Sequence, residues 1–398
     1  MHPSTQLALT ALLSIHLLAP LAHASRGDPL VAHQGQAVDQ LIAEFMKEHQ
    51  IPGMALAIVQ APYITRVSGY GLADPTPKTL VGTATVFPLG QMLNGFTAVA
   101  LLQQVEAGNL SLDAPAKTYL PRLPGNLGTL LVRDILRQST GLPDLPAKAK
   151  SPEAALTHVA RARTRFEPGQ RIIPSSTNQL LARMLIAAAA SKPFPDIIRE
   201  GQIERLALTQ TFFRADLPPT ENLADGHLHR LFLTDPRRIN PIEPAVGPRS
   251  PVNPDPWEPE LLSSAHDISL WDIGLAGDIL IRSPELRALL YTPSDLPAET
   301  SGRSSGVWTF PGRPGLMTLT GSASGCSSFL SRYTAPEELL CVTLLANRPN
   351  LPLAPLAARI AAAFDARLIQ TVPPERGSPS GQTRPHPPQH HLSQSGPR

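Results

Sequence analysis

Two amide side chains stand where the chain would be expected to carry reactive groups. An apolar, helically spaced pattern begins after Gly90 and ends before the stop signal Gly108, which places Gln91 at the exposed tip of an otherwise buried helix. A serine hydrolase presents its nucleophile at such a tip. Gln91 has no hydroxyl to deprotonate, and Asn94, one helical turn further on, does not titrate near neutral pH. Neither side chain can therefore act as a nucleophile or as a base.

Two serines remain as alternative nucleophiles. Ser304 lies in the segment Gly302-Arg-Ser-Ser-Gly306, which matches the pattern G-x-S-x-G. That pattern forms a nucleophile elbow only between a strand and a helix. Here a strand-like run follows, so a flexible loop before a strand is the favoured interpretation. Ser175 stands at the start of a helical pattern, where we expect a role at a turn or helix end.

The histidines offer no evident base and no evident metal site. The mid-chain candidates are His158, His227, His229 and His266, and no acidic residue is spaced to orient one of them. The pair His227-Leu-His229 would chelate a metal ion if it lay on a strand, but a third ligand is not apparent. We therefore expect neither a metal nor another cofactor.

The pattern of apolar residues predicts the elements that position these side chains. Helical spacing is found over 35–49, 91–107, 152–163, 178–190, 195–206, 264–272 and 353–366. Strand-like runs occupy 54–59, 63–68, 306–311, 315–320, 325–332 and 339–346. This order predicts an α/β (α+β) fold, in which helices flank both faces of an antiparallel sheet and an all-α lobe is inserted at about 110–260. Within the lobe, residues 215–260 are proline-rich and aperiodic, which indicates a long surface excursion.

The helix with the two amides resembles the first motif of the serine β-lactamase and penicillin-binding-protein superfamily, and class C β-lactamases and their hydrolase relatives most of all. That family writes the segment F-x-x-G-S-x-x-K-x-F-T, with Ser as the nucleophile and Lys as its proton acceptor. The chain keeps Phe87, Gly90, Phe96 and Thr97 of this frame. Gln91 replaces the Ser and Asn94 replaces the Lys. Colinear similarities extend from Ile51 to Asp365, and the resemblance implies a β-lactamase/transpeptidase-like fold.

The resemblance extends to the two other motifs, and both have also lost their chemical residues. Pro174 and Ser176 stand where the family has the Tyr and Asn of Tyr-x-Asn. Leu319-Thr320-Gly321 replaces Lys/His-Thr-Gly, so an aliphatic side chain stands in place of a cation. In the family, two backbone N–H groups bind the substrate carbonyl, and the matching groups here belong to Gln91 and Ser322. The resemblance thus makes the following residues candidates for ligand binding: Gln91, Asn94, Ser176, Thr320, Gly321 and Ser322.

Composition and the two ends of the chain bound its location and partners. Residues 1–24 carry an apolar run and an Ala22-His-Ala24 cleavage pattern, which predicts a secretory signal peptide and export to a bacterial periplasm. The β-lactamase-related domain would then span 25–370, and the polar segment 371–398 is expected to be a disordered tail. The net charge is only +2 and the sequence has no cluster of basic residues, so nothing indicates a surface that binds nucleic acid. No later run is long enough to cross a membrane.

The two cysteines are expected to remain free. Only Cys326 and Cys341 occur, and a hairpin turn at 335–338 would not place them opposite each other. We therefore expect two buried thiols.

Taken together, these residues favour an exported pseudoenzyme that keeps a binding cleft. Its ligand would be a fragment of peptidoglycan, a peptide or acyl compound, or a protein partner. The alternative from another class is an active hydrolase or esterase that uses Ser304 or Ser175. A third interpretation is a decaying paralogue, and it predicts a collapsed cleft filled with apolar side chains.

Overall fold

A long antiparallel sheet forms the centre of the molecule. The computed structural model describes residues 32–368, apart from 34, 61–62, 75–78, 217–256, 258, 300–301, 324 and 336–338. Within the described residues, eight strands form the sheet in the order β5-β4-β3-β13-β12-β11-β10-β9, and every neighbouring pair is antiparallel. The strands are β3 (Gly53–Gln60), β4 (Tyr63–Asp74), β5 (Thr79–Leu80), β9 (Arg303–Ser304), β10 (Thr309–Phe310), β11 (Leu316–Ala323), β12 (Cys326–Tyr333) and β13 (Leu340–Ala346). The short strands β6 (Phe87–Pro88), β7 (Phe212–Phe213) and β8 (Leu261–Ser263) make a second sheet, and β1 (Ala32–His33) pairs with β2 (Gln36–Ala37).

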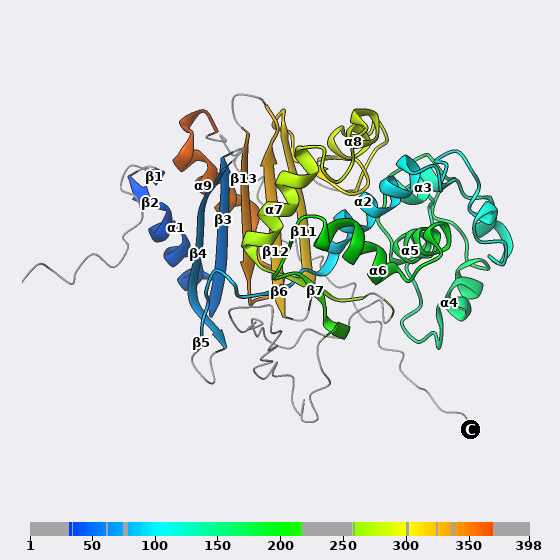
Figure 1. Cartoon of the computed structure of the whole chain (residues 1–398), viewed down its shortest axis with the longest axis horizontal. Coiled ribbons are helices and arrows are strands. Elements are labelled where there is room, and N and C mark those ends of the chain that lie inside the picture. The colour runs from blue at the N-terminus through cyan, green and yellow to red at the C-terminus, as the bar shows by residue number, and fades with distance from the viewer. Residues whose placement is uncertain are drawn as a thin grey trace, which may run out of the picture.

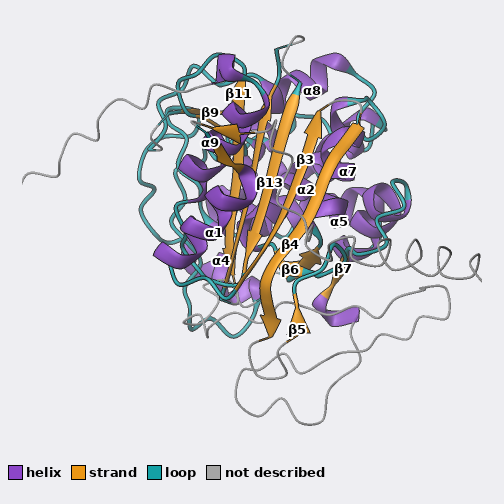
Figure 2. Ribbon diagram, turned by 90° about the vertical axis from the view of Figure 1, so that its left-hand side faces the viewer, coloured by secondary structure: helices purple, strands orange, loops and turns teal. Residues whose placement is uncertain are grey.

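Helices cover both faces of the large sheet, and further helices gather in a lobe at one side (Figures 1 and 2). α1 (Val38–Glu48) and α9 (Leu353–Phe364) pack on one face, and α7 (Ala265–Ala276) packs on the other. The lobe contains α3 (Val132–Leu136), α4 (Pro152–Val159), α5 (Ser176–Ala190) and α6 (Phe194–Ile198), while α8 (Pro284–Tyr291) lies near one end of the sheet. α2 (Leu93–Glu106) joins the two parts, because it packs against α5 and α6 and its preceding turn contacts β11. The predicted α/β fold with an antiparallel sheet flanked by helices is confirmed.

Alternation along the strands divides the core into two layers. Successive side chains of a strand point to opposite faces, so Leu319 and Leu330, which pair across β11 and β12, lie on the α7 face. The neighbouring pair Thr320 and Phe329 lies on the opposite face, where Phe329 joins the core under α9. The helical lobe and α7 share one apolar cluster, so the motif helix lies between the sheet and the lobe.

The motif helix α2 is fixed by aromatic and amide contacts rather than by an amphipathic stripe. The buried residues of α2 lie on all sides of the helix and are mostly apolar, as expected for a helix inside the core. Phe96 stacks on Trp271 of α7 with ring centroids 4.4 Å apart. The buried Gln202 accepts a hydrogen bond from Trp271 Nε1 at 2.8 Å and donates one to the Phe96 carbonyl at 2.8 Å. These contacts join α2, α7 and the segment around Gln202, so they fix α2 relative to both.

Most predicted elements match the structure, with local differences. Ser264 caps α7 as predicted, because its hydroxyl accepts a hydrogen bond from the Asp267 N–H. The predicted helix 195–206 is α only as far as Ile198 and continues as a π-type turn over Arg199–Glu204 (η4). The predicted strand 306–311 shrinks to β10, because Gly306 adopts a positive φ of 96° in a turn.

The two cysteines are free and buried, as predicted. Cys326 pairs with Ala323 and Cys341 with Arg332, so the strand register keeps the thiols apart. Several expectations lie wholly or mostly outside the described residues: the signal peptide over 1–24, the excursion over 215–260 with the pair His227 and His229, and the tail over 371–398. Within the described part, no helix has the length and apolar character needed to cross a membrane.

Candidate functional site

The tip of the motif helix is pressed against strand β11. Gly90, Gln91 and Met92 form a 3-10 turn, η1, that enters α2, and Gly90 has a positive φ of 54°. A Cβ atom at Gly90 would lie 2.6 Å from the Ser322 carbonyl carbon. A Cβ atom at Gly321 would lie 2.0 Å from the Leu89 carbonyl oxygen. Only glycine allows this approach at both positions, so the turn and the strand touch through their backbones.

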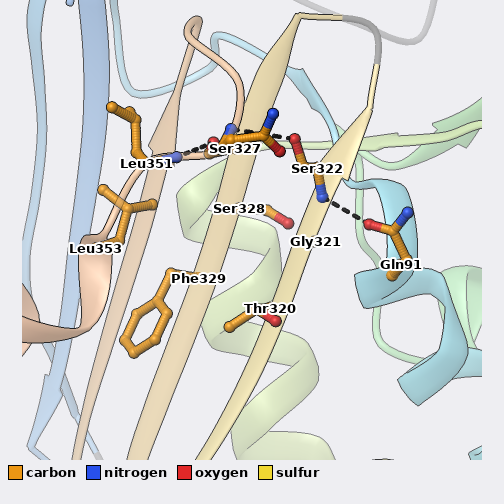
Figure 3. Close-up of a pocket in the computed structure, with 10 residues that line it drawn as sticks. Gln91, Thr320, Gly321, Ser322, Ser327, Ser328, Phe329, Leu351 and Leu353 are labelled. Carbon is orange, nitrogen blue, oxygen red and sulfur yellow. Dashed lines mark hydrogen bonds between the residues drawn. The ribbon is translucent and has the colours of Figure 1, made fainter. Parts of the chain in front are cut away.

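Gln91 uses this proximity to bond the strand. Its side-chain Oε1 accepts a hydrogen bond from the Ser322 N–H at 2.8 Å (Figure 3). The Ser328 hydroxyl of β12 donates to the Leu89 carbonyl at 2.7 Å, which holds the turn from the other side. The two backbone groups that the resemblance implied as carbonyl donors, those of Gln91 and Ser322, therefore lie together at the helix tip. The Gln91 side chain lies between the Ser322 donor and solvent.

The two other replaced positions near the helix are neutral and packed. Leu319 is 3% exposed and lies over Gly95 of α2, where a Cβ atom would approach Leu319 Cδ2 to 2.7 Å. Asn94 is half-buried, and its buried Oδ1 has no hydrogen-bond partner among the described residues. A cation and a proton acceptor are thus replaced by an aliphatic group in the core and by an amide.

The second motif forms a hydrogen-bonded network at the start of α5. Ser176 accepts a hydrogen bond from the Leu145 N–H at 2.9 Å, and its own N–H donates to Asp144 Oδ1 at 2.8 Å. Pro174 is exposed and supplies no donor in the preceding turn. The Thr140 hydroxyl donates to Asn178 Oδ1 at 2.6 Å. These contacts fasten the start of α5 to the preceding loop, so Ser176 has a structural role here.

The alternative nucleophiles are buried and already bonded. The Ser304 hydroxyl donates to the Trp308 carbonyl at 3.0 Å and accepts from the Gly306 N–H at 2.9 Å. The segment lies in the β9–β10 hairpin, so the strand–turn–helix context of a nucleophile elbow is absent at Ser304. Ser175 is 4% exposed and caps α5 by accepting a hydrogen bond from the Asn178 N–H. Neither serine is hydrogen-bonded to a histidine among the interactions of the described residues.

A pocket of about 340 Å³ opens beside the helix tip. One wall consists of Gln91, Thr320, Gly321 and Ser322, and the remainder of the lining is Ser327, Ser328, Phe329, Asn350, Leu351 and Leu353. Figure 3 shows Gln91 on the turn beside β11, Thr320 to Ser322 on β11, Ser327 to Phe329 on β12, Leu351 just before α9 and Leu353 at its start. The structure therefore brings together four of the six predicted ligand-binding residues, whereas Asn94 and Ser176 do not line this pocket.

The sequence interpretation missed the second wall of this pocket. The strand pattern of 325–332 contained Ser327 and Phe329, but only the register against β11 shows that they face the same side as Thr320 and Ser322. Asn350 and Leu351 follow β13 in an irregular segment without a periodic signal. Charged side chains are absent from the pocket lining, and no three metal-ligating residues gather in the described part of the chain.

Comparisons with known proteins agree with this architecture. The family model described as Beta-lactamase matches residues 38–366. A β-lactamase of Pseudomonas fluorescens is 27% identical over 199 residues, which cover 47% of this chain and 52% of that protein. Protein flp of Staphylococcus aureus (strain COL) is 24% identical over 190 residues, covering 45% of this chain and 38% of its own length. The matched region thus spans about half of these curated relatives or less.

Solved structures share the fold. The octameric penicillin-binding protein homologue from Pyrococcus abyssi superposes with a TM-score of 0.64 at 21% identity, covering 83% of this chain and 76% of the other. A class C β-lactamase gives a TM-score of 0.65 at 17% identity and covers 82% and 95%. With a family match over most of its length, this chain belongs to the β-lactamase family.

Proposed function

We propose that this protein is an exported, catalytically inactive member of the β-lactamase family that binds a ligand in the pocket beside Gln91. The carrying observation is the chemistry of the helix tip, where Gln91 and Asn94 are both amides. An amide supplies neither a nucleophile nor a titrating base, and loss of one member of such a catalytic unit already lowers rates by orders of magnitude. The pocket supports the retained binding role, because its lining combines hydroxyl, amide and backbone groups with the apolar side chains of Phe329, Leu351 and Leu353.

The ligand class follows from that lining. A peptide or acyl compound combines carbonyl groups with apolar parts, and the same holds for a fragment of peptidoglycan. Phe329, Leu351 and Leu353 provide the apolar contacts, while Thr320 is exposed on the polar wall. Export, predicted from residues 1–24, would bring the protein to the compartment in which such compounds occur.

The test of inactivity is covalent labelling of the purified protein from Ser25 onward. The protein is treated separately with a fluorescent penicillin and with a fluorophosphonate, and its intact mass is read before and after. We expect no adduct with either probe, while a class C β-lactamase treated in parallel is labelled. A stoichiometric adduct that maps to one serine, such as Ser304 or Ser175, would show that the protein is an active hydrolase and overturn the proposal.

The variant Gln91→Ser sharpens the same test. It restores a hydroxyl at the helix tip but leaves Asn94 and Pro174 without a base, so we expect no turnover of a β-lactam or ester substrate. Measurable acylation of this single variant would contradict the assignment of an inactive site.

A further inference from the structure

We infer that the Gln91 side chain is an internal ligand of the Ser322 backbone donor, so that an external carbonyl compound binds there only by displacing it. This inference rests on the binding function proposed above and specifies what the ligand must do. It begins with the contact between Gln91 Oε1 and the Ser322 N–H at 2.8 Å. A backbone N–H only donates, so the amide oxygen and not the amide nitrogen must face it.

The Ser322 donor is available because the sheet is open at this point. The ladder between β10 and β11 reaches only the pair Thr309 and Thr318. Alternate residues of a strand direct their N–H groups to the same edge, so Ser322, four residues after Thr318, faces the same edge beyond the end of that ladder. In the described structure, a side-chain amide occupies the place that a neighbouring carbonyl group would take.

The backbone of the turn that carries Gln91 is held rigidly, whereas the Gln91 side chain can rotate away from the Ser322 N–H. The backbone contacts of Gly90 and Gly321 and the bond from Ser328 to Leu89 fix the turn on the strand. Gln91 itself is exposed, so water reaches its amide and the bond to Ser322 is exchanged without opening the core. Displacement therefore requires a rotation of one side chain and no movement of α2.

The displaced amide also defines the ligand. The incoming group must offer an acceptor equivalent to Gln91 Oε1, which an amide or ester carbonyl does. Phe329, Leu351 and Leu353 line the same pocket and offer apolar contacts to the rest of the ligand. Because charged residues are absent from the lining of the pocket, the site favours an uncharged compound. Benzamide combines these features and carries the same primary amide as Gln91.

The experiment compares benzamide binding to the wild-type protein and to Gln91→Ala by NMR of the Ser322 amide. We expect the alanine variant to bind benzamide about two- to tenfold more tightly, with a shift of the Ser322 signal, because the probe no longer competes with Gln91. Gln91→Glu keeps an acceptor on the same stem and should bind benzamide no better than the wild type. Gln170→Ala removes an exposed glutamine elsewhere and serves as the matched control. Benzyl alcohol, which lacks the carbonyl, should show no gain.

Hydrogen exchange gives an independent readout. The Ser322 amide should be partly protected in the wild type and exchange about two- to tenfold faster in Gln91→Ala. Equal benzamide affinity in the wild type and the alanine variant, or an unprotected Ser322 amide in the wild type, would overturn the inference. If Gln91→Ala does not fold, wild-type exchange and the Gln91→Glu titration still decide it. These outcomes differ from failure of the proposed function, which appears as a covalent adduct in the labelling test.

Discussion

Two buried positions on the same face of the central sheet differ in charge: one carries an ion pair and the other an aliphatic side chain. On β12, Arg332 is buried and its Nε donates to Asp272 Oδ1 of α7 at 2.9 Å. On β11, Leu319 lies on that same face and packs over the motif helix, where the family resemblance implied a cation. A full ion pair is thus kept in the core at Arg332, while the position of Leu319 is occupied by a neutral aliphatic side chain.

The difference between these two positions indicates that a buried charge is tolerated where an opposite charge from the same chain pairs with it. Burial raises the pKa of the Asp272 carboxyl, and the Arg332 guanidinium beside it counteracts part of that rise. The cation that the resemblance implied at position 319 would have had a substrate carboxylate as its partner. Gln91 and Asn94 carry no charge, so a lysine at position 319 would lack an anion. Its ammonium group would lose its hydration, and no Coulombic attraction would compensate for that cost. Residues that hold the fold and residues that do chemistry are separable here.

The largest effect is expected from breaking the ion pair. Arg332→Met leaves the Asp272 carboxylate buried without its partner, and we expect a loss of about 3–5 kcal/mol in the free energy of unfolding. The measurement is equilibrium denaturation in guanidinium chloride. The double variant Asp272→Leu/Arg332→Met removes both charges and should recover most of the loss. A single variant as stable as the wild type would show that the pair is not needed for burial of either charge.

Placing a charge at position 319, beneath the motif helix, should cost somewhat less. Leu319→Lys puts an unpaired ammonium group into a position that is 3% exposed, so we expect a loss of about 2–4 kcal/mol. The variant Leu319→Met is the control for packing, and volume-conserving changes of this kind usually cost less than about 1.5 kcal/mol. Both are compared by thermal and chemical denaturation. Equal stability of Leu319→Lys and Leu319→Met would mean that an anion already lies within reach of this position.

The smallest effect is expected for the dependence of the free energy of unfolding on alkaline pH. Two buried thiols on the same face of the sheet cause it. Burial raises the pKa of the Cys326 and Cys341 thiols above the ordinary value of 9.0. Near and above pH 9 the unfolded chain loses these protons while the folded chain keeps them, so the folded state binds more protons. The free energy of unfolding should therefore fall by up to about 1.4 kcal/mol per pH unit for each thiol.

Denaturation curves recorded between pH 8 and pH 10 measure this slope. Cys341→Ala should flatten it relative to the wild type, because one of the two raised pKa values is removed. A slope that stays unchanged in Cys341→Ala would show that this thiol does not titrate differently in the folded and unfolded states.

Local signals allowed much of the fold to be predicted. The start of α7 at Ser264, the strands 325–332 and 339–346, and the closing helix from Leu353 follow from caps and apolar spacing, which depend on neighbouring residues alone. The predicted strand 306–311 begins too early and β9 was not predicted, because the turn at Gly306 depends on close packing against Arg137 in the lobe. The wall formed by Asn350 and Leu351 had no local signal at all.

The sequence alone determined that the side chains at the helix tip cannot act as nucleophile or base, because nucleophilicity and basicity are properties of side-chain type. Gln91, Asn94 and Leu319 lack them in any conformation. Only the tertiary structure decided what those side chains do instead. Gln91 and Ser322 are 231 positions apart in the chain, and their hydrogen bond exists because two glycines let a helical turn touch a strand. Such a contact depends on distances between distant segments, which residue types do not specify.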